Sequence, residues 1–280
     1  MGKSLILGFF DGVHKAHRAV IESALNCSED VTLITFKESP AVYFCHKAEY
    51  ILSREESVNK MKLLGVKEVV ELDFPDIADI TAEKYLEHIV DTYKPNYIST
   101  GYNHTFGLNK AGNSTFLEQN ESKYGYKYIC TLPVEENCEI ISSTLIKEYI
   151  KKGNVEYANY LLESSFILEG TVIHGAKIGR TIGFPTANIN YSKDIVKLPF
   201  GVYSALINGK KTVMNWGMKP TVNNTQEPVV EAHILDFDGD LYGKKIKIEV
   251  LKQIRGEKKF ASLDELKTQI SEDVKQCLEL

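Results

Sequence analysis

The hydrophobic pattern of this chain changes its period near residue 163, and this change limits the folds that are open to it. Before that point, apolar runs of strand length alternate with helical stretches; after it, short strand-like runs follow one another between turns. The first pattern predicts an open, mostly parallel sheet covered by helices. The second pattern predicts a small closed antiparallel β-barrel. We therefore expect an α/β protein with two domains, residues 1–162 and 163–280.

The expected elements follow from these periods. In the first half, strands are expected at 3–9, 31–36, 68–72, 97–100 and 126–132, and helices at 15–25, 54–64, 82–92, 114–123 and 155–162. In the second half, strands are expected at 166–173, 202–207, 211–216, 229–236 and 245–253. Asn208-Gly209 predicts a tight hairpin. A final helix at 263–279 is expected to pack on the barrel through Leu266, Ile270, Val274 and Leu278.

Charge and cysteine usage narrow the class of protein. The formal net charge is -5, which argues against a non-specific binder of nucleic acid or of membrane surfaces. No apolar run has the length of a membrane span, and the N-terminus does not resemble a signal peptide. The five cysteines are odd in number and scattered, which is typical of reduced thiols in a cytoplasmic protein.

The turn after the first strand, residues 8–17, is the first candidate site, since ligands of open α/β sheets lie at the carboxyl ends of strands. His14 and His17 are three residues apart, hence neighbours on one face of a helix that begins there. A helix N-terminus offers free N–H groups to a phosphate, and two imidazoles would help to hold it. The alternative is that the histidines only cap the helix.

A second helix N-terminus carries a run of hydroxyl groups at Ser142, Ser143 and Thr144. Hydroxyl side chains favour helix N-termini, and such an N-terminus also suits a phosphate group.

Residues 179–188 carry the most specific pattern of side chains in the second half. Thr186 and Asn188 lie on one side of the chain if this segment is extended. A hydroxyl and an amide oxygen are hard ligands of the kind that Mg²⁺ takes, together with substrate phosphates. Nearby glycines and Arg180 suit a nucleotide's phosphates. The alternative is an ordinary turn rich in Gly and Pro.

Glu231 is the best candidate for a general base. It alternates with Val230 and Ala232, so we expect it to face the barrel interior. A buried carboxylate costs free energy unless it has a partner or a function. The alternative is a surface glutamate on an edge strand.

The residues from Gly179 to Asn188, Gly-Arg-x-x-Gly-Phe-Pro-Thr-Ala-Asn, resemble the signature of riboflavin kinases. Further segments at 215–221, 231–237, 239–243 and 255–260 resemble that family in the same order. The first half resembles the adenylyltransferase module that is fused to this kinase in bacterial bifunctional riboflavin kinase/FAD synthetases. The resemblance spans nearly the whole chain, with the more specific motifs in the second half.

For the second half, the resemblance implies transfer of the γ-phosphoryl group of ATP to the 5′-hydroxyl of riboflavin, giving FMN. Glu231 would then accept the proton, and Thr186 and Asn188 would hold Mg²⁺. The residues implied at the ATP site are Gly179, Arg180, Gly183, Pro185, Thr186 and Asn188. Those implied at the flavin site are Asn215, Arg255 and Phe260; without the family, residues 255–260 are a solvated run of charges.

For the first half, the resemblance implies a Rossmann-like nucleotidyltransferase domain that adenylates FMN to FAD. The residues implied at its ATP site are Gly8, Phe10, Asp11, His14, His17, Ser143, Thr144 and Lys147. Those implied at its flavin site are Asn103 and His104.

Several positions depart from the family pattern of the first half: Ala16 replaces a glycine, Lys147 an arginine, Glu38 and Ser39 a Pro-His pair, and Asn103 and His104 an Asp-Phe pair. Ala16 would cost about 1–2 kcal/mol if its φ were positive, and almost nothing in a first helical turn. These departures keep open a kinase with a degenerate first module, and a regulatory protein that binds flavins or nucleotides. Small molecules are the expected partners, and a homo-oligomer stays open.

Overall fold

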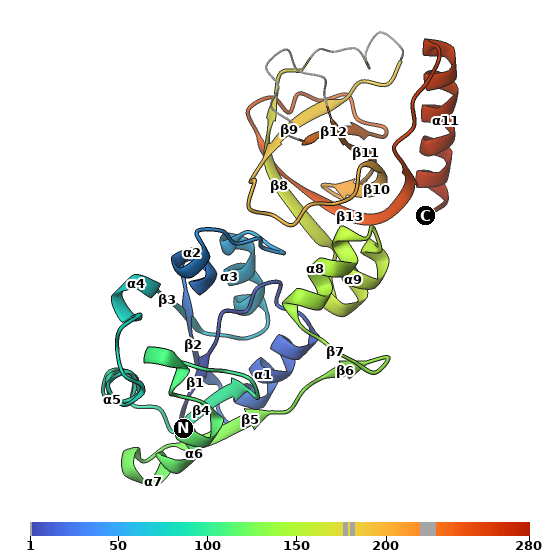
Figure 1. Cartoon of the computed structure of the whole chain (residues 1–280). Helices are drawn as coiled ribbons and strands as arrows, with labels where there is room; N and C mark the ends of the chain where they lie inside the picture. Colours follow the sequence, from blue (N-terminus) through green and yellow to red (C-terminus); the bar gives the residue numbers. More distant parts are fainter. Residues whose placement is uncertain (1, 176–178, 180–182, 219–227) are drawn as a thin grey trace. The chain divides into compact units, whose positions relative to one another are not determined.

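The computed structural model describes residues 2–175, 179, 183–218 and 228–280. The chain forms two compact units, Met1–Leu145 and Ile146–Leu280 (Figure 1). Two helices follow the first unit along the chain, α8 (Ser143–Lys151), which begins just before the division, and α9 (Val155–Leu162). The domain boundary that the sequence indicates, after residue 162, stays a prediction.

The first unit is built on a parallel sheet in the order β3-β2-β1-β4-β5, as expected. From β1, the chain continues to β2 and β3 on one side and then crosses to β4 and β5 on the other side. The connections that follow β1 and β4 therefore run in opposite directions along the sheet. A short antiparallel pair, β6 and β7, follows the last strand. The strands of this unit are β1 (Lys3–Leu7), β2 (Asp30–Phe36), β3 (Glu68–Leu72), β4 (Tyr97–Gly101), β5 (Lys127–Thr131), β6 (Glu135–Glu136) and β7 (Glu139–Ile140).

Helices cover both faces of this sheet because its strands alternate buried side chains between the two faces. Leu5 and Leu7 of β1 pack with α5, whereas Ile6 packs with α1 and α3. The helices are α1 (Lys15–Leu25), α2 (Pro40–Cys45), α3 (Arg54–Leu63), α4 (Phe74–Ile77), α5 (Ala82–Tyr93), α6 (Ser114–Gln119) and α7 (Glu121–Tyr124), with a 3₁₀ turn η1 (Leu108–Lys110).

The second unit contains a closed antiparallel barrel in the order β10-β11-β12-β9-β8-β13, with β13 returning to β10. One face of each strand fills the inside, where Trp216, Tyr203 and Phe166 are fully buried. The strands are β8 (Phe166–Ile173), β9 (Ala187–Tyr191), β10 (Gly201–Ile207), β11 (Lys210–Met218), β12 (Pro228–Ile234) and β13 (Lys245–Gly256).

The last helix, α11 (Leu263–Glu279), runs along the outside of the barrel (Figure 1). Cys277 is fully buried there and packs in a cluster with Val202 and Val213 of the outer barrel face. The expectation that Leu278 packs on the barrel is wrong, since 53% of it is exposed. The buried residues of this helix are Asp273 and Cys277. Each stands one residue before a member of the expected apolar stripe, Val274 and Leu278, so the helix turns a slightly different face to the barrel than the sequence suggested.

Most of the expected elements are present with ends within a few residues of those predicted. The hairpin at Asn208-Gly209 is confirmed, with φ of 51° and 73° at its two residues. The helix expected at 114–123 is two helices, because the Asn120 side chain donates to the carbonyl oxygen of Phe116 (2.8 Å) at the break. The short helices α2 and α4 were not expected.

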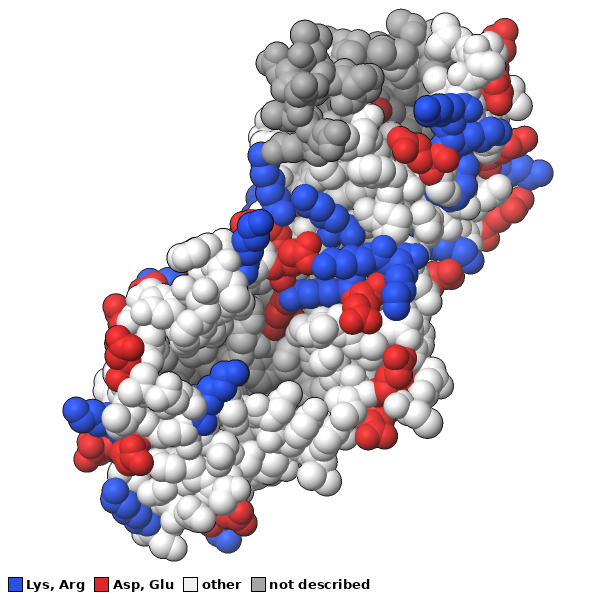
Figure 2. All heavy atoms as spheres, in the orientation of Figure 1, with Lys and Arg blue, Asp and Glu red and all other residues white. Residues whose placement is uncertain are grey.

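The surface carries charges of both signs (Figure 2). The face of the first unit seen there is hollowed, and most atoms around the hollow belong to uncharged residues. Among the described residues, no helix combines the length and the apolar character that crossing a bilayer requires.

Candidate functional site

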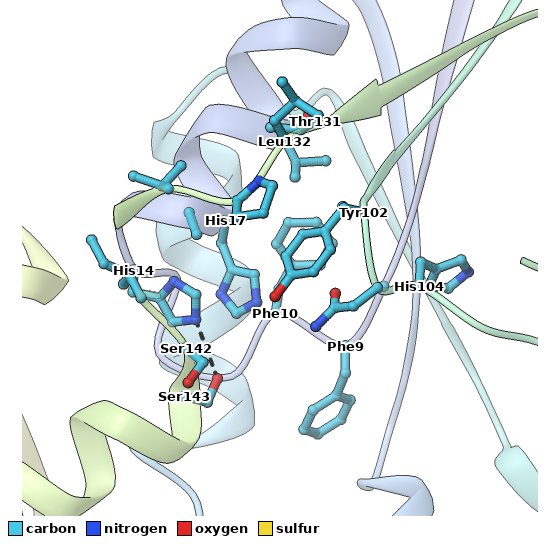
Figure 3. Close-up of a pocket in the computed structure, with 18 of the residues that line it drawn as sticks. Phe9, Phe10, His14, His17, Tyr102, His104, Thr131, Leu132, Ser142 and Ser143 are labelled. Carbon is cyan, nitrogen blue, oxygen red and sulfur yellow. Dashed lines mark hydrogen bonds between the residues drawn. The ribbon is translucent and has the colours of Figure 1, made fainter. Parts of the chain in front are cut away.

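A cavity of about 370 Å³ opens at the carboxyl ends of β1, β4 and β5 in the first unit, here called the switch-point cavity (Figure 3). It lies where the strand order reverses, as sheets of this kind lead us to expect. Of the residues that the sequence indicates, those that line it are Gly8, Phe10, His14, Ala16, His17, Asn103, His104, Ser142, Ser143 and Thr144.

Two helix N-termini contribute to this cavity. His14 begins α1, and its ring stacks on that of His17, with 3.7 Å between the centroids. The Ser143 hydroxyl, at the start of α8, lies 3.4 Å from His14 Nε2 and donates to the carbonyl oxygen of Asp11 (2.9 Å). The free N–H groups of both helices and the imidazoles therefore gather at one place, which is the arrangement that a phosphate chain requires.

The loop before α1 is held in an unusual backbone conformation. Phe10 and Val13 have positive φ angles of 61° and 48°, and such strain, about 1–2 kcal/mol per residue, is typical of functional loops. A Cβ at Gly8 would collide with the Phe10 ring, so only glycine fits there. Ala16 lies in the first turn of α1 without a positive φ, so its departure from the family glycine costs no backbone strain.

Burial keeps His17 uncharged. Desolvation lowers the pKa of His17 well below its ordinary value, and neighbouring His14 lowers it further. A neutral imidazole still donates or accepts one hydrogen bond at each nitrogen, and Nδ1 of His17 has no partner among the described residues. His17 is therefore suited to hydrogen bonding with a ligand rather than to charge pairing.

A larger cavity of about 560 Å³ adjoins the first and shares Leu7, Gly8, His104 and Thr105 with it. We call it the aromatic cavity, because four aromatic rings line it, those of Phe36, Tyr43, Phe44 and Phe74. The centroids of the first three rings lie 5.4–5.6 Å from that of Phe74. These four residues were not predicted from the sequence to line a site. They come from β2, α2 and α4, and no periodicity joins them; the only signal was the clustering of aromatic side chains in two short segments.

The two predicted flavin residues of this unit take different positions. Asn103 lines only the switch-point cavity, whereas His104 lines both the switch-point cavity and the aromatic cavity. The ring of His104 points away from His14 and His17 (Figure 3). Burial lowers the pKa of His104 to about 4, so this residue replaces the family's aromatic side chain with a neutral imidazole.

This burial predicts a pH-dependent stability. Between the ordinary histidine pKa of 6.5 and the folded value of about 4, the unfolded chain binds more protons than the folded chain. The free energy of unfolding of the first unit should therefore fall as the pH is lowered through this window, and the fall should be smaller in His104→Phe. Urea unfolding followed by far-UV circular dichroism measures it. Trp216 fluorescence, which reports on the barrel, should not distinguish the variant from the wild type.

In the second unit, a cavity of about 380 Å³ lies on the outer face of the barrel, bordered by α11; we call it the outer-face cavity. Glu231 lines it, directly opposite Asn188 on β9 and Asn215 on β11 in the strand register. Facing residues on neighbouring strands lie roughly 4.5–5.5 Å apart at Cβ. The expectation that Glu231 faces the barrel interior is wrong, since Val230 and Ala232 fill that face, and the carboxylate instead faces the cavity.

Thr186 and Asn188 line the same cavity; Asn188 belongs to β9, and Thr186 directly precedes this strand. The segment before β9 is held by His233, whose Nδ1–H donates to the carbonyl oxygen of Pro185 (2.8 Å). A Cβ at Gly175 would collide with the Asn188 amide, so the backbone packs tightly around this group. Hydroxyl and amide oxygens beside one carboxylate form a donor set that suits Mg²⁺ bound mainly to phosphates. The described residues hold no cluster of three His, Cys, Asp or Glu side chains of the kind that binds a metal by protein alone.

A further cavity of about 410 Å³, here called the Tyr242 cavity, meets the outer-face cavity at Thr186, which lines both. Pro185, Ala187 and the turn from Phe237 to Tyr242 line it. The His174 ring stacks on that of Tyr242, with 4.0 Å between the centroids. The two cavities therefore share Thr186, one of the two residues that the sequence indicates as ligands of Mg²⁺.

The remaining predicted residues are placed as follows. Gly179, Asn215, Arg255 and Phe260 line the outer-face cavity, and Arg255 and Lys258 lie over the Phe260 ring. Gly183, with a φ of 90°, is exposed and lines neither cavity of the barrel. Asp11 accepts a hydrogen bond from the backbone N–H of Ile51 (2.9 Å) and does not line the switch-point cavity. Lys147 lies on α8 in the second unit, and Arg180 lies outside the described residues.

The fold and these cavities define a two-unit protein: a nucleotide-binding type of α/β sheet, and a β-barrel whose outer face carries a carboxylate beside hydroxyl and amide oxygens. Family models match both parts, FAD synthetase over residues 1–145 and riboflavin kinase over residues 162–280. The chain belongs to the bifunctional riboflavin kinase/FMN adenylyltransferase family.

Relatives support this membership over the whole chain. The bifunctional riboflavin kinase/FMN adenylyltransferase of Bacillus subtilis is 33% identical over 290 residues, covering 98% of this chain and 91% of the relative. That of Escherichia coli is 33% identical over 285 residues, covering 97% and 90%. A crystal structure from Streptococcus pneumoniae, described as a macrolide-efflux protein, is 30% identical with a TM-score of 0.90, covering 100% of this chain and 94% of that chain.

Proposed function

We propose that the second unit phosphorylates riboflavin to FMN with ATP. The observation that carries the proposal is the position of Thr186 where two cavities meet, with Glu231 beside Asn188 in the strand register. A kinase must bring two substrates together at one phosphoryl group, and catalysis comes from their alignment and from charge stabilisation. The Tyr242 cavity would take the nucleotide and the outer-face cavity the flavin.

In this proposal, Glu231 accepts the proton of the 5′-hydroxyl, and Asn215, Arg255 and Phe260 orient the flavin. Thr186 and Asn188 would hold Mg²⁺, and Gly179, which lines the same cavity, would lie close to the phosphates. A bound divalent cation supplies neutralisation of phosphate charge. In the same proposal, α11 and the loop after β13, whose side chains border the outer-face cavity, would limit the access of water to the reacting groups.

We further propose that the first unit adenylates FMN to FAD. The switch-point cavity offers two helix N-termini, the imidazole of His14 and the neutral imidazole of His17 to the phosphates of ATP. The aromatic cavity beside it suits a flat isoalloxazine ring, which stacks on aromatic faces. The position of Ala16 in the first turn of α1 favours this activity over a degenerate module, because the replacement of the family glycine carries no backbone strain.

One assay tests both proposals. Purified protein is incubated with riboflavin, ATP and Mg²⁺, and the products are separated by chromatography. FMN together with FAD supports both activities, whereas FMN alone would confine turnover to the second unit. Formation of neither product would contradict the proposal and favour a regulatory protein that only binds flavins or nucleotides.

The aromatic cavity gives a separate prediction. Tyr43 is 44% exposed on α2, so Tyr43→Ser removes one wall of the cavity without opening the core. Loss of one stacking ring should weaken FMN binding to the first unit about 2- to 10-fold. FMN adenylylation at varied FMN concentration measures this as a higher KM, and FMN formation from riboflavin serves as the control. An unchanged KM for FMN would place the flavin elsewhere.

Two wider assignments rest on the same proposal. We place the boundary of the kinase domain after residue 162, where the family match begins. All five cysteines are free, which supports the proposed cytoplasmic location.

A further inference from the structure

A buried carboxylate on α11 has no part in the proposed chemistry. Asp273 is 1% exposed, although it belongs to a helix whose other charged residues face the solvent. It accepts hydrogen bonds from Arg255 on β13: Nε donates to Oδ1 (2.9 Å), and Nη2 donates to Oδ2 (2.8 Å). This two-point contact holds the guanidinium plane in one orientation.

The contact with Asp273 occupies one edge of the guanidinium group and leaves another available. Nη1 donates to the carbonyl oxygen of Gly256 (3.0 Å). One N–H of Nη1 and one of Nη2 then have no acceptor among the described residues. Arg255 and Asn215 flank Val202 in the strand register, and all three residues line the outer-face cavity.

The same carboxylate organises the rim of the cavity. Gln269 donates to Asp273 Oδ1 (3.2 Å) and accepts a hydrogen bond from Lys258 (3.2 Å). The Phe260 ring lies beneath both cations, with 5.7 Å between its centroid and the Arg255 guanidinium carbon and 5.5 Å to the Lys258 nitrogen. Asp273 is therefore the common anchor of a network that includes two predicted flavin residues.

Stabilisation of the fold is a poor explanation for this group. A buried ion pair gives little or no net stability compared with apolar residues of the same volume, because both charges lose hydration. The helix already packs through Cys277, which is fully buried one turn further on. The pair is better explained by what it fixes, which is the orientation of a cation facing a substrate cavity.

We propose that Asp273 is a positioning residue for flavin binding at the kinase site, and that it aims the two remaining N–H groups of Arg255 at oxygen acceptors of the flavin. Two sources of such oxygens exist, the carbonyl groups of the ring system, present in riboflavin and FMN, and the phosphate of the product FMN. The proposal rests on the proposed kinase activity of this unit, because the flavin is placed here by that function.

The test compares Asp273→Asn with the wild type in FMN formation at varied riboflavin concentration, and with added FMN as inhibitor. The amide keeps the size of the carboxylate but loses its charge and one acceptor. We expect the KM for riboflavin or the inhibition constant of FMN to rise about tenfold, with kcat changed much less. A rise in both identifies ring oxygens as the acceptors, and a rise in the FMN constant alone identifies the phosphate. Unchanged values for both constants would overturn the proposal.

A second variant and a control separate positioning from folding. Cys277→Ala disturbs the packing of α11 without touching Arg255 and should leave both constants unchanged. Asp273→Glu keeps the charge and should restore part of the affinity; it also keeps the test available if Asp273→Asn does not fold, as judged by Trp216 fluorescence. The double variant Asp273→Asn/Arg255→Ala should be no weaker than Arg255→Ala, and additive losses would contradict the proposal. Absence of FMN formation by the wild type would contradict the kinase function itself, which is a different outcome.

Discussion

Replacing Glu231 by glutamine should lower the rate of FMN formation by about 10²–10⁴-fold. The amide has the size of the carboxylate and can still form hydrogen bonds, but it cannot accept the proton of the riboflavin hydroxyl. The affinity for riboflavin should change little, since Asn215 and the network around Arg255 remain in place. Steady-state kinetics of FMN formation would therefore show a lower kcat with a nearly unchanged KM.

The matched control is Glu249→Gln. Glu249 also lies on a barrel strand, β13, but it lines neither the outer-face cavity nor the Tyr242 cavity. Its variant should form FMN at the wild-type rate. Wild-type turnover by Glu231→Gln would remove Glu231 from the role of general base, and a loss of barrel folding, seen by Trp216 fluorescence, would show that the carboxylate is structural.

Replacing His14 by alanine should reduce FAD formation from supplied FMN by about 10²–10³-fold, as expected for loss of one preorganised donor to a transition state. The stacking of His14 on His17, 3.7 Å between ring centroids, and its contact with Ser143 Oγ would be lost with the ring. FMN formation from riboflavin should be unaffected, because His14 belongs to the first unit.

Two further variants sharpen this experiment. The His14 side chain makes no capping hydrogen bond, whereas the asparagine of His14→Asn can cap α1. A similar loss of FAD formation by both variants would therefore assign the effect to the imidazole rather than to the helix end. His88, an exposed histidine on α5, provides the control, and His88→Ala should form FAD normally. Undiminished FAD formation by His14→Ala would show that the switch-point cavity does not hold the reacting phosphates.

Elements with a strong internal period could be predicted closely from the sequence. The bounds of α1, α9 and α11, and of β3 and β8, agree with the expected ranges, because the side-chain period of a helix or strand is a local property of the chain. The alternation of strands and helices in the first half was sufficient to predict a parallel sheet, and the run of short strands in the second half was sufficient to predict a closed antiparallel barrel. The motif around Thr186 and Asn188 left an extended segment and a turn open, and in the structure β9 begins between the two residues, at Ala187.

Other features depended on packing between distant segments. Glu231 lies on the outer face of the barrel because its neighbours Val230 and Ala232 fill the inside. The prediction that Glu231 faces the interior was wrong, since alternation alone does not say which of the two faces is the inner one. The phase of α11 was also misjudged, because Asp273 is buried by its pairing with Arg255 and no hydrophobic pattern signals such a residue. In the aromatic cavity, the ring of Phe36 on β2 contacts that of Phe74 on α4. The two residues are far apart in the chain, so no local pattern predicts this contact.

The sequence by itself determined the periods, the order of the elements and the chemical types available: a hydroxyl, two amides, a carboxylate, and imidazoles after the first strand. The tertiary structure decided which of them meet. The row Asn188, Glu231 and Asn215 exists only because three strands pair in one register, and register is fixed by the burial of the opposite face in the barrel. A local pattern specifies a side chain's own element, whereas its neighbours in space are set by the packing of the whole unit.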